Sequence, residues 1–139
     1  MKSIDWSEDL LVNVHSIDAQ HEELYVAMNA VLGAVNEKQP SRIVEYLIQA
    51  VSEHTATHCH DEEALMIKWE YPGFEPQKKD HDYFSREIDS MKESLEKGNL
   101  SYGKLAEDLF KLAGFFSMHI RKLDSQLGRF INERPADES

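Results

Sequence analysis

HTATHCHDE, residues 54–62, carries an ionisable side chain at every fourth position, namely His54, His58 and Glu62. At about 100° per residue, this spacing places the three side chains on one face of an α-helix. Apolar residues continue the same periodicity before and after the segment. The three ionisable groups are therefore expected in the stripe that faces the core, where unpaired polar groups are costly. A metal ion is the natural partner for them.

The bulk composition is that of one globular domain. The chain has 139 residues, of which 41% are hydrophobic, and this length is typical of a single domain over residues 1–139. The net charge of −11 disfavours nucleic acid and anionic membrane surfaces as partners, because both would repel the protein.

The single cysteine, Cys59, excludes an internal disulfide bond. The N-terminal residues MKSIDW contain no apolar signal core, and no apolar run approaches the roughly 20 residues that a membrane span needs. These features indicate a cytoplasmic protein.

The hydrophobic periodicity is helical throughout, which predicts an all-α fold. Asp18 is a plausible N-cap of the first helix, Pro40 precedes the second helix and Tyr71-Pro72-Gly73 stops it, and Gly98 ends the third. Because the connections are short, neighbouring helices should be antiparallel and form an up-down-up-down four-helix bundle. The expected helices span residues 18–37, 41–69, 76–97 and 102–132, after an irregular N-terminal arm over residues 1–17.

Each of the four expected apolar stripes contains a histidine. A single histidine on an apolar face is ordinarily a hydrogen-bonded core residue, but one in every stripe indicates a shared site. Antiparallel helices bring all four to one end of the bundle core, where helical bundles hold metals. The four are His21, His58, His81 and His119.

Imidazole together with carboxylate suits iron, zinc, copper or manganese. Two further acidic residues, Glu62 and Asp124, are placed to bridge a pair of metal ions. The chain lacks the paired Glu-x-x-His motifs of ferritin-like di-iron proteins and the His-Glu-x-x-His motif of zinc peptidases. A dinuclear site of another type is therefore expected.

Several motifs together resemble those of bacterial hemerythrins, over residues from about 6 to 130. The resemblance covers nearly the whole chain, and the combined motifs are highly specific. They are Trp6, Ile17-Asp18-Ala19-Gln20-His21, His58-x3-Glu62 with Glu63 and Met66, Tyr71-Pro72-Gly73-Phe74, His81, and His119-Ile120-x3-Asp124.

The resemblance implies a four-helix bundle that binds O2 reversibly at a non-haem di-iron centre. Two iron ions, alternating between Fe2+ and Fe3+, would be joined by an oxo or hydroxo bridge. By position, the resemblance assigns His21 and His58 to one iron, His81 and His119 to the other, and Glu62 and Asp124 to both as bridges.

One position departs from the family pattern. The third helix of the family carries two histidines four residues apart, but here the first of these positions is Gln77 and only the second, His81, is a histidine. The amide oxygen of Gln77 would be a weak ligand, or the position would be left to water. We expect weaker binding of the second iron and faster autoxidation. The alternative is that Gln77 merely hydrogen-bonds near the helix N-terminus.

The resemblance also places Cys59, Phe115 and Phe116 around the O2 pocket, with Cys59 at a position that is usually phenylalanine. Cys59 either tunes the bound ligand or is an inert buried thiol. His54, one turn before His58, is expected to hydrogen-bond near the site or to pack without a role. His15, His60 and the acidic residues Glu22, Glu23 and Glu63 are interpreted as helix surface.

The leading functional prediction is O2 binding for storage, delivery or sensing. One alternative is a di-iron oxidoreductase that acts on peroxide or nitric oxide, which Gln77 and Cys59 favour. Another is a module that senses O2, redox state or iron. The sequence indicates no protein partner.

Overall fold

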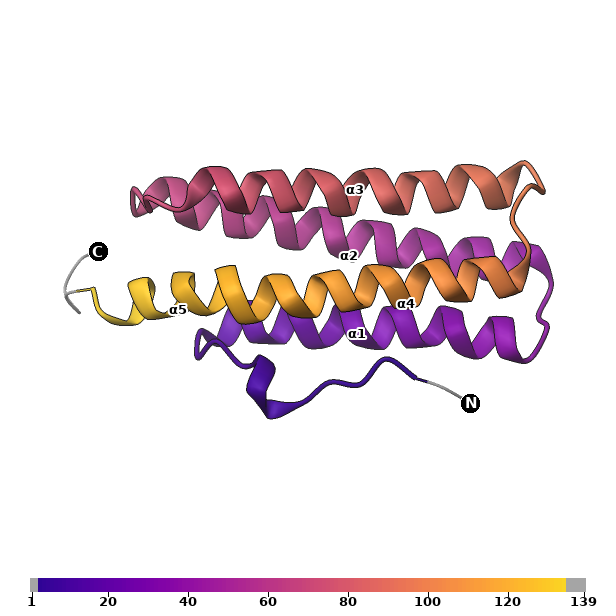
Figure 1. Ribbon diagram of the computed structural model, residues 1–139, viewed down its shortest axis with the longest axis horizontal. Coiled ribbons are helices and arrows are strands. Elements are labelled where there is room, and N and C mark those ends of the chain that lie inside the picture. Colours follow the sequence, from indigo (N-terminus) through magenta and orange to yellow (C-terminus); the bar gives the residue numbers. More distant parts are fainter. Residues whose placement is uncertain (1–2, 135–139) are drawn as a thin grey trace.

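The computed structural model describes residues 3–134 and confirms the all-α, up-down-up-down four-helix bundle (Figure 1). No strand occurs within these residues. A 3₁₀ turn, Glu8–Leu10, lies in the N-terminal arm, and a π-helical turn, Ile120–Asp124, lies between the last two helices. The helices are α1 (His15–Asn36), α2 (Ser41–Lys68), α3 (Phe74–Glu96), α4 (Tyr102–His119) and α5 (Ser125–Asn132).

The apolar core runs along the bundle axis, where α1 packs on α2, α2 on α3, and α4 on both α1 and α3. Val31, Val44, Val51, Leu105 and Leu109 are completely buried. Burial of each such side chain contributes about 1.5–3 kcal/mol. This core holds together the half of the bundle that lies away from the cluster of histidines.

Helix α1 begins at His15, three residues before the expected start, and Asp18 is not its N-cap. Val14 occupies that position. The Asp18 carboxylate instead accepts hydrogen bonds from the backbone N–H groups of Val12, at 2.8 Å, and Asn13, at 3.1 Å. Asp18 therefore ties the N-terminal arm to the first turn of the helix.

The arm also packs against α5, and a glycine permits the contact. A Cβ atom at Gly128 would lie 2.3 Å from the carbonyl oxygen of Val12, which is too close for any side chain. The side-chain amide of Asn132 donates to the carbonyl oxygen of Asn13 at 2.9 Å. The arm therefore joins the first helix to the last.

The single helix expected over residues 102–132 is interrupted by the π-helical turn. The N–H of Ser125 donates to the carbonyl oxygen of Ile120, five residues back, and the Ser125 hydroxyl donates to the Arg121 carbonyl at 2.5 Å. On a regular α-helix, His119 and Asp124 would point about 140° apart. The π-helical turn brings both into the core, where they are 3% and 0% exposed.

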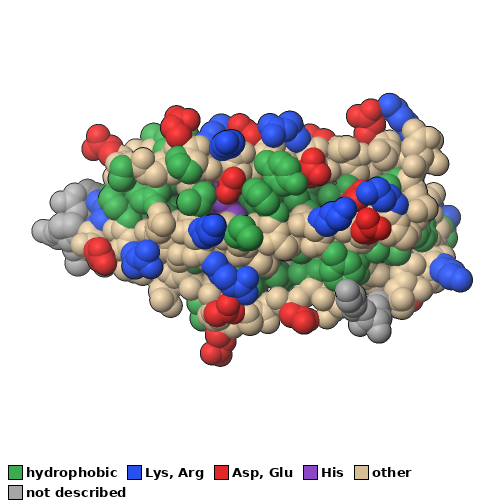
Figure 2. Space-filling view, in the orientation of Figure 1, with side chains coloured by type: hydrophobic (Ala, Val, Ile, Leu, Met, Phe, Trp, Pro, Cys, Tyr) green, Lys and Arg blue, Asp and Glu red, His purple; other side chains and the backbone are tan. Residues whose placement is uncertain are grey.

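Acidic and basic side chains are interspersed over the face shown in Figure 2, with apolar side chains between them. None of the helices within residues 3–134 is both long enough and apolar enough to cross a membrane.

Candidate metal centre

Six side chains of metal-ligand type meet at the end of the bundle where α2 turns into α3. Helices α1, α2, α3 and α4 contribute one histidine each, α2 also contributes a carboxylate, and the π-helical turn contributes the second. All six are at most 3% exposed. They are His21, His58, Glu62, His81, His119 and Asp124.

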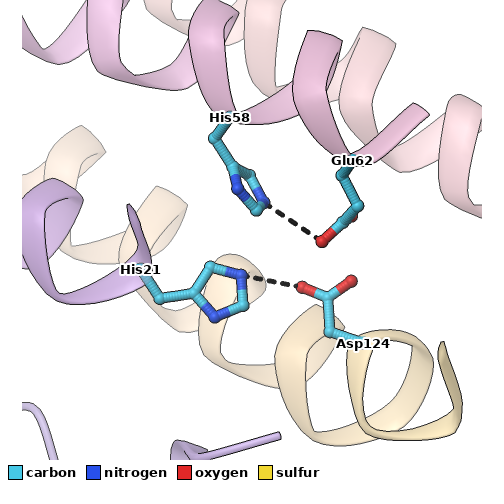
Figure 3. A group of neighbouring side chains, drawn as sticks. All are labelled: His21, His58, Glu62 and Asp124. Atoms are coloured by element: carbon cyan, nitrogen blue, oxygen red, sulfur yellow. Dashed lines mark ion pairs between the residues drawn. The ribbon is translucent and has the colours of Figure 1, made fainter. Parts of the chain in front are cut away.

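Each carboxylate contacts two histidines, one through each of its oxygens, and the two histidines belong to different pairs. Oδ2 of Asp124 lies 3.0 Å from Nε2 of His21, and Oδ1 lies 3.2 Å from Nε2 of His119. Likewise, Oε2 of Glu62 lies 3.4 Å from Nε2 of His58, and Oε1 lies 2.9 Å from Nε2 of His81. Figure 3 shows the half of this arrangement formed by His21, His58, Glu62 and Asp124.

These separations fit metal ligation. Ligand atoms about 2.1 Å from one transition-metal ion lie about 3 Å from one another when they are adjacent. In one group, four such atoms lie within 4.8 Å of one another, and in a second group three do, with Glu62 common to both. Five inward-facing atoms are buried without a hydrogen-bond partner in the described residues: Nε2 of His21, His58 and His119, Oε2 of Glu62 and Oδ2 of Asp124. A pair of metal ions would satisfy them.

The burial of the cluster shapes the charges of its members. Burial, together with the neighbouring His21, lowers the pKa of His58 to about 3. His58 is therefore neutral and has a nitrogen lone pair available for a metal. Burial, together with the charge of Asp124, raises the pKa of Glu62 well above its usual value. Burial acts in the same direction on Asp124, but the imidazoles of His119 and His21 beside it outweigh burial and hold the pKa of Asp124 low.

Comparison with known proteins agrees with this geometry. Residues 12–131 match the family described as the hemerythrin HHE cation binding domain. The chain belongs to the hemerythrin family. The match covers α1 to α5 almost completely and includes all six buried metal-binding side chains.

Individual relatives include animal and bacterial proteins. A myohemerythrin from Sipunculus nudus is 29% identical over 99 residues, which are 71% of this chain and 77% of that protein. A bacteriohemerythrin from Pseudomonas paraeruginosa is 28% identical over 98 residues, or 70% of this chain and 63% of that protein. A bacteriohemerythrin from Ralstonia nicotianae is 23% identical over 137 residues, covering 99% of this chain and 95% of that protein.

Three of the four histidines have a hydrogen-bond partner for their outer nitrogen, Nδ1. The partner of His58 is the Gln20 amide oxygen, at 2.9 Å. Carboxylates serve the other two: Glu63 lies 2.7 Å from Nδ1 of His81, and Asp80 lies 2.7 Å from Nδ1 of His119. Such contacts orient each ring with Nε2 toward the metal.

The sequence interpretation missed the roles of these three partners. Gln20 and Asp80 were not singled out for a role, and the assignment of Glu63 to the surface was wrong because this side chain is half-buried against His81. Gln20 and Asp80 each directly precede a metal-binding histidine, His21 and His81, and Glu63 directly follows Glu62. A polar residue adjacent to a ligand is the signal that points to them.

The expectation that His54 lies in the core stripe was wrong. Its side chain is exposed and lines a surface pocket with Gln20 and Glu53, and Thr55 takes the core position. Because eight residues separate His54 from Glu62, their side chains point about 80° apart around the helix. The position on the buried face is therefore that of Thr55. His60 and His15 are exposed, as expected.

A small apolar cavity of about 10 Å³ lies beside His58. Cys59 and Phe116 line it, and the ring of Phe116 lies 5.4 Å from that of His21. Burial raises the pKa of the Cys59 thiol, which therefore stays protonated at neutral pH. Phe115 was expected to line the pocket as well but does not, because adjacent residues on a helix point in different directions and Phe116 is the one that faces the cavity.

The ring of Phe115 contacts α3 instead. Its centroid lies 4.5 Å from that of Tyr83 and 5.4 Å from that of Phe84. Phe84 in turn packs against Phe116. Phe115 therefore supports the pocket wall from behind.

Gln77 is completely buried beside the second pair of histidines. Its amide N–H donates to Oδ1 of Asp124 at 2.9 Å, and its amide oxygen has no hydrogen-bond partner within residues 3–134. The side chain therefore contacts the same carboxylate oxygen as His119 and presents one unsatisfied oxygen to the centre.

Proposed function

We propose that this chain binds O2 reversibly at a non-haem di-iron centre, for storage, delivery or sensing. The observation that carries the proposal is the division of the carboxylate oxygens of Glu62 and Asp124 between two pairs of histidines. A site for a single ion does not need this arrangement, and two adjacent ions do. Membership of the hemerythrin family supports iron as the metal and O2 as the ligand.

Iron at this site would supply the electrons that O2 takes up on binding. The protein groups hold the site in place and keep water out of it. Neutral imidazoles offer Nε2 lone pairs, and their outer hydrogen bonds keep the rings oriented. The aromatic wall around Phe116 and the complete burial of the carboxylates exclude solvent, which slows the loss of a reduced oxygen species.

Removal of a bridging carboxylate tests the dinuclear assignment. Glu62→Ala and Asp124→Ala should each lower the iron content from two ions per chain to one or none while the helical circular dichroism persists. The exposed His60→Ala is the matched control and should leave iron content unchanged. Two irons retained in both carboxylate variants would refute the bridging roles.

We propose further that Gln77 weakens the second iron site and accelerates autoxidation. The hydrogen bond of Gln77 to Asp124 supports this proposal, because it replaces a strong imidazole donor by an amide that contacts the bridge. Gln77→His should slow autoxidation of the O2 complex and tighten binding of the second iron. Gln77→Leu, which has neither donor nor acceptor, is the control and should bind the second iron more weakly still. Equal autoxidation rates in the Gln77→His variant and the unmodified protein would contradict the proposal.

Turnover of peroxide or nitric oxide is the second candidate function. Gln77 favours it, because a position without a strong ligand is open to a reacting molecule. An enzyme should consume peroxide or nitric oxide continuously with an electron donor, at a rate that Gln77→His suppresses. A sensing module should instead change its shape or oligomeric state when the ligand binds.

A further inference from the structure

A surface groove of about 150 Å³ runs between α2 and α3, next to the metal centre. Its residues are mostly small, and three of them, Ala56, Ser85 and Asp89, are exposed at its rim. The full lining is Ser52, Thr55, Ala56, Ser85, Ile88 and Asp89.

The floor of the groove is also a wall of the apolar cavity. Thr55 and Ile88 line both spaces and are only 4% and 3% exposed. On the other side of these two side chains, the cavity is lined by His58 and Phe116. A single layer of two side chains therefore separates the surface groove from the space beside a metal-binding histidine.

No hydrogen bond within residues 3–134 holds the Thr55 side chain in this wall. Its hydroxyl is buried and has no hydrogen-bond partner in the described part of the chain. A helical threonine ordinarily bonds a carbonyl of the preceding turn, and this bond restricts rotation about χ1. Without such a bond, no hydrogen bond of the Thr55 side chain has to break when this side chain moves aside.

A second surface pocket also reaches the centre, between α1 and α2. Glu62 lies at its base, and its lining includes Gln20, Asp61 and Lys68 as well as the apolar Ile17 and Leu65. Polar and charged groups of this kind suit water and ions. Behind the wall formed by Thr55 and Ile88 lies an apolar cavity instead, which suits a small uncharged gas.

We propose that a small apolar gas enters the metal centre through the α2–α3 groove, passing between Thr55 and Ile88 into the cavity beside His58. The identification of this gas as O2 rests on the function proposed above. The route itself depends only on the groove, the shared wall and the cavity.

Tryptophan at the rim of the groove tests the route without disturbing the core. Ser85 is exposed and lines the groove, whereas Ser90 is exposed on the same helix outside the lining. Ser85→Trp should slow the reaction of O2 with the ferrous protein by about tenfold, as expected for a blocked entrance. Ser90→Trp should leave the rate unchanged. The O2 affinity should be equal in both variants, because a blocked route slows entry and exit alike.

A third variant identifies the competing route. Ala64 is exposed and lines the α1–α2 pocket. Unchanged rates in Ser85→Trp together with slowed rates in Ala64→Trp would overturn the proposal in favour of that pocket. If all three variants react with O2 as fast as the unmodified protein, the proposal is overturned as well.

Xenon provides a test that does not depend on O2 binding. Crystals of the iron-loaded protein under xenon pressure should hold a xenon atom in the cavity between His58, Thr55 and Ile88. Xenon in the α1–α2 pocket with none in the cavity would contradict the proposal. If the ferrous protein forms no stable O2 complex, the proposed function fails, but xenon occupancy and the rate of ferrous oxidation by O2 still test the route.

Discussion

The outer hydrogen bonds of the histidines differ between the two halves of the centre. His81 and His119 donate to the carboxylates of Glu63 and Asp80, whereas His58 faces the neutral amide of Gln20. A carboxylate on Nδ1 makes the imidazole a stronger donor at Nε2. The two carboxylates therefore hydrogen-bond to the pair of histidines beside Gln77. This is the half of the centre in which Gln77 takes the place of a histidine of the family pattern.

Neutralisation of one of these carboxylates should weaken the second iron site. Glu63→Gln keeps a hydrogen-bond acceptor near Nδ1 of His81 but removes the charge, and we expect about a tenfold loss of affinity for the second iron. Competition with a chelator of known affinity measures this change. Glu87→Gln, on the exposed face of α3, is the control. Affinity equal to that of the unmodified protein would show that the charge of Glu63 does not reach the metal.

At the residue scale, periodicity alone predicted the buried positions of the four histidines and Glu62, because ligands on helices must follow the core stripe. The hydrogen-bond partners Gln20, Glu63 and Asp80 were harder to predict. They lie at half-buried positions, where helical periodicity does not distinguish a structural role from ordinary surface.

At the scale of elements, the π-helical turn was the feature that periodicity obscured. A regular helix over residues 102–132 places Leu123 in the core stripe, whereas the structure leaves Leu123 half-buried and buries Asp124. The signal was present in the sequence, since His119 and Asp124 are five residues apart and both are ligand candidates. Only a turn with one extra residue brings both to the same face, and π-helical turns are frequent at functional sites.

Packing of the arm against α5 gives a prediction at this scale. Gly128→Ala places a methyl group against the Val12 carbonyl and should lower the melting temperature, because the arm must move. Gly114→Ala, where no atom lies within 4 Å of the added Cβ, should raise it through improved helix propensity. Thermal unfolding followed by circular dichroism measures both effects. A Gly128→Ala variant as stable as the unmodified protein would mean that the arm does not contribute to stability.

At the scale of the whole molecule, the bundle combines an apolar core along its axis with a cluster of buried polar groups toward one end. The helical periodicity and short connections predicted this architecture, because a bundle follows from amphipathic helices of similar length. The course of the arm was beyond prediction from periodicity, since it depends on one glycine and on hydrogen bonds between residues distant in sequence.

We expect the stability of the whole bundle to depend on metal bound at its polar end. Iron bound to the folded cluster should raise the melting temperature by about 10 °C at saturating concentration. Differential scanning calorimetry of metal-free and iron-loaded protein measures this shift. Glu62→Ala should lose most of the increase, while His60→Ala should keep it. An unchanged melting temperature on iron loading would argue against a site built from these buried groups.

The central claim is tested most directly by iron content per chain, measured together with the ultraviolet–visible spectrum of the anaerobically reduced protein before and after exposure to O2. We expect two irons per chain and a visible absorption band that forms with O2 and disappears when O2 is removed. Two irons that pass directly to a stable oxidised spectrum would contradict reversible O2 binding, and fewer than two irons would contradict the dinuclear centre itself.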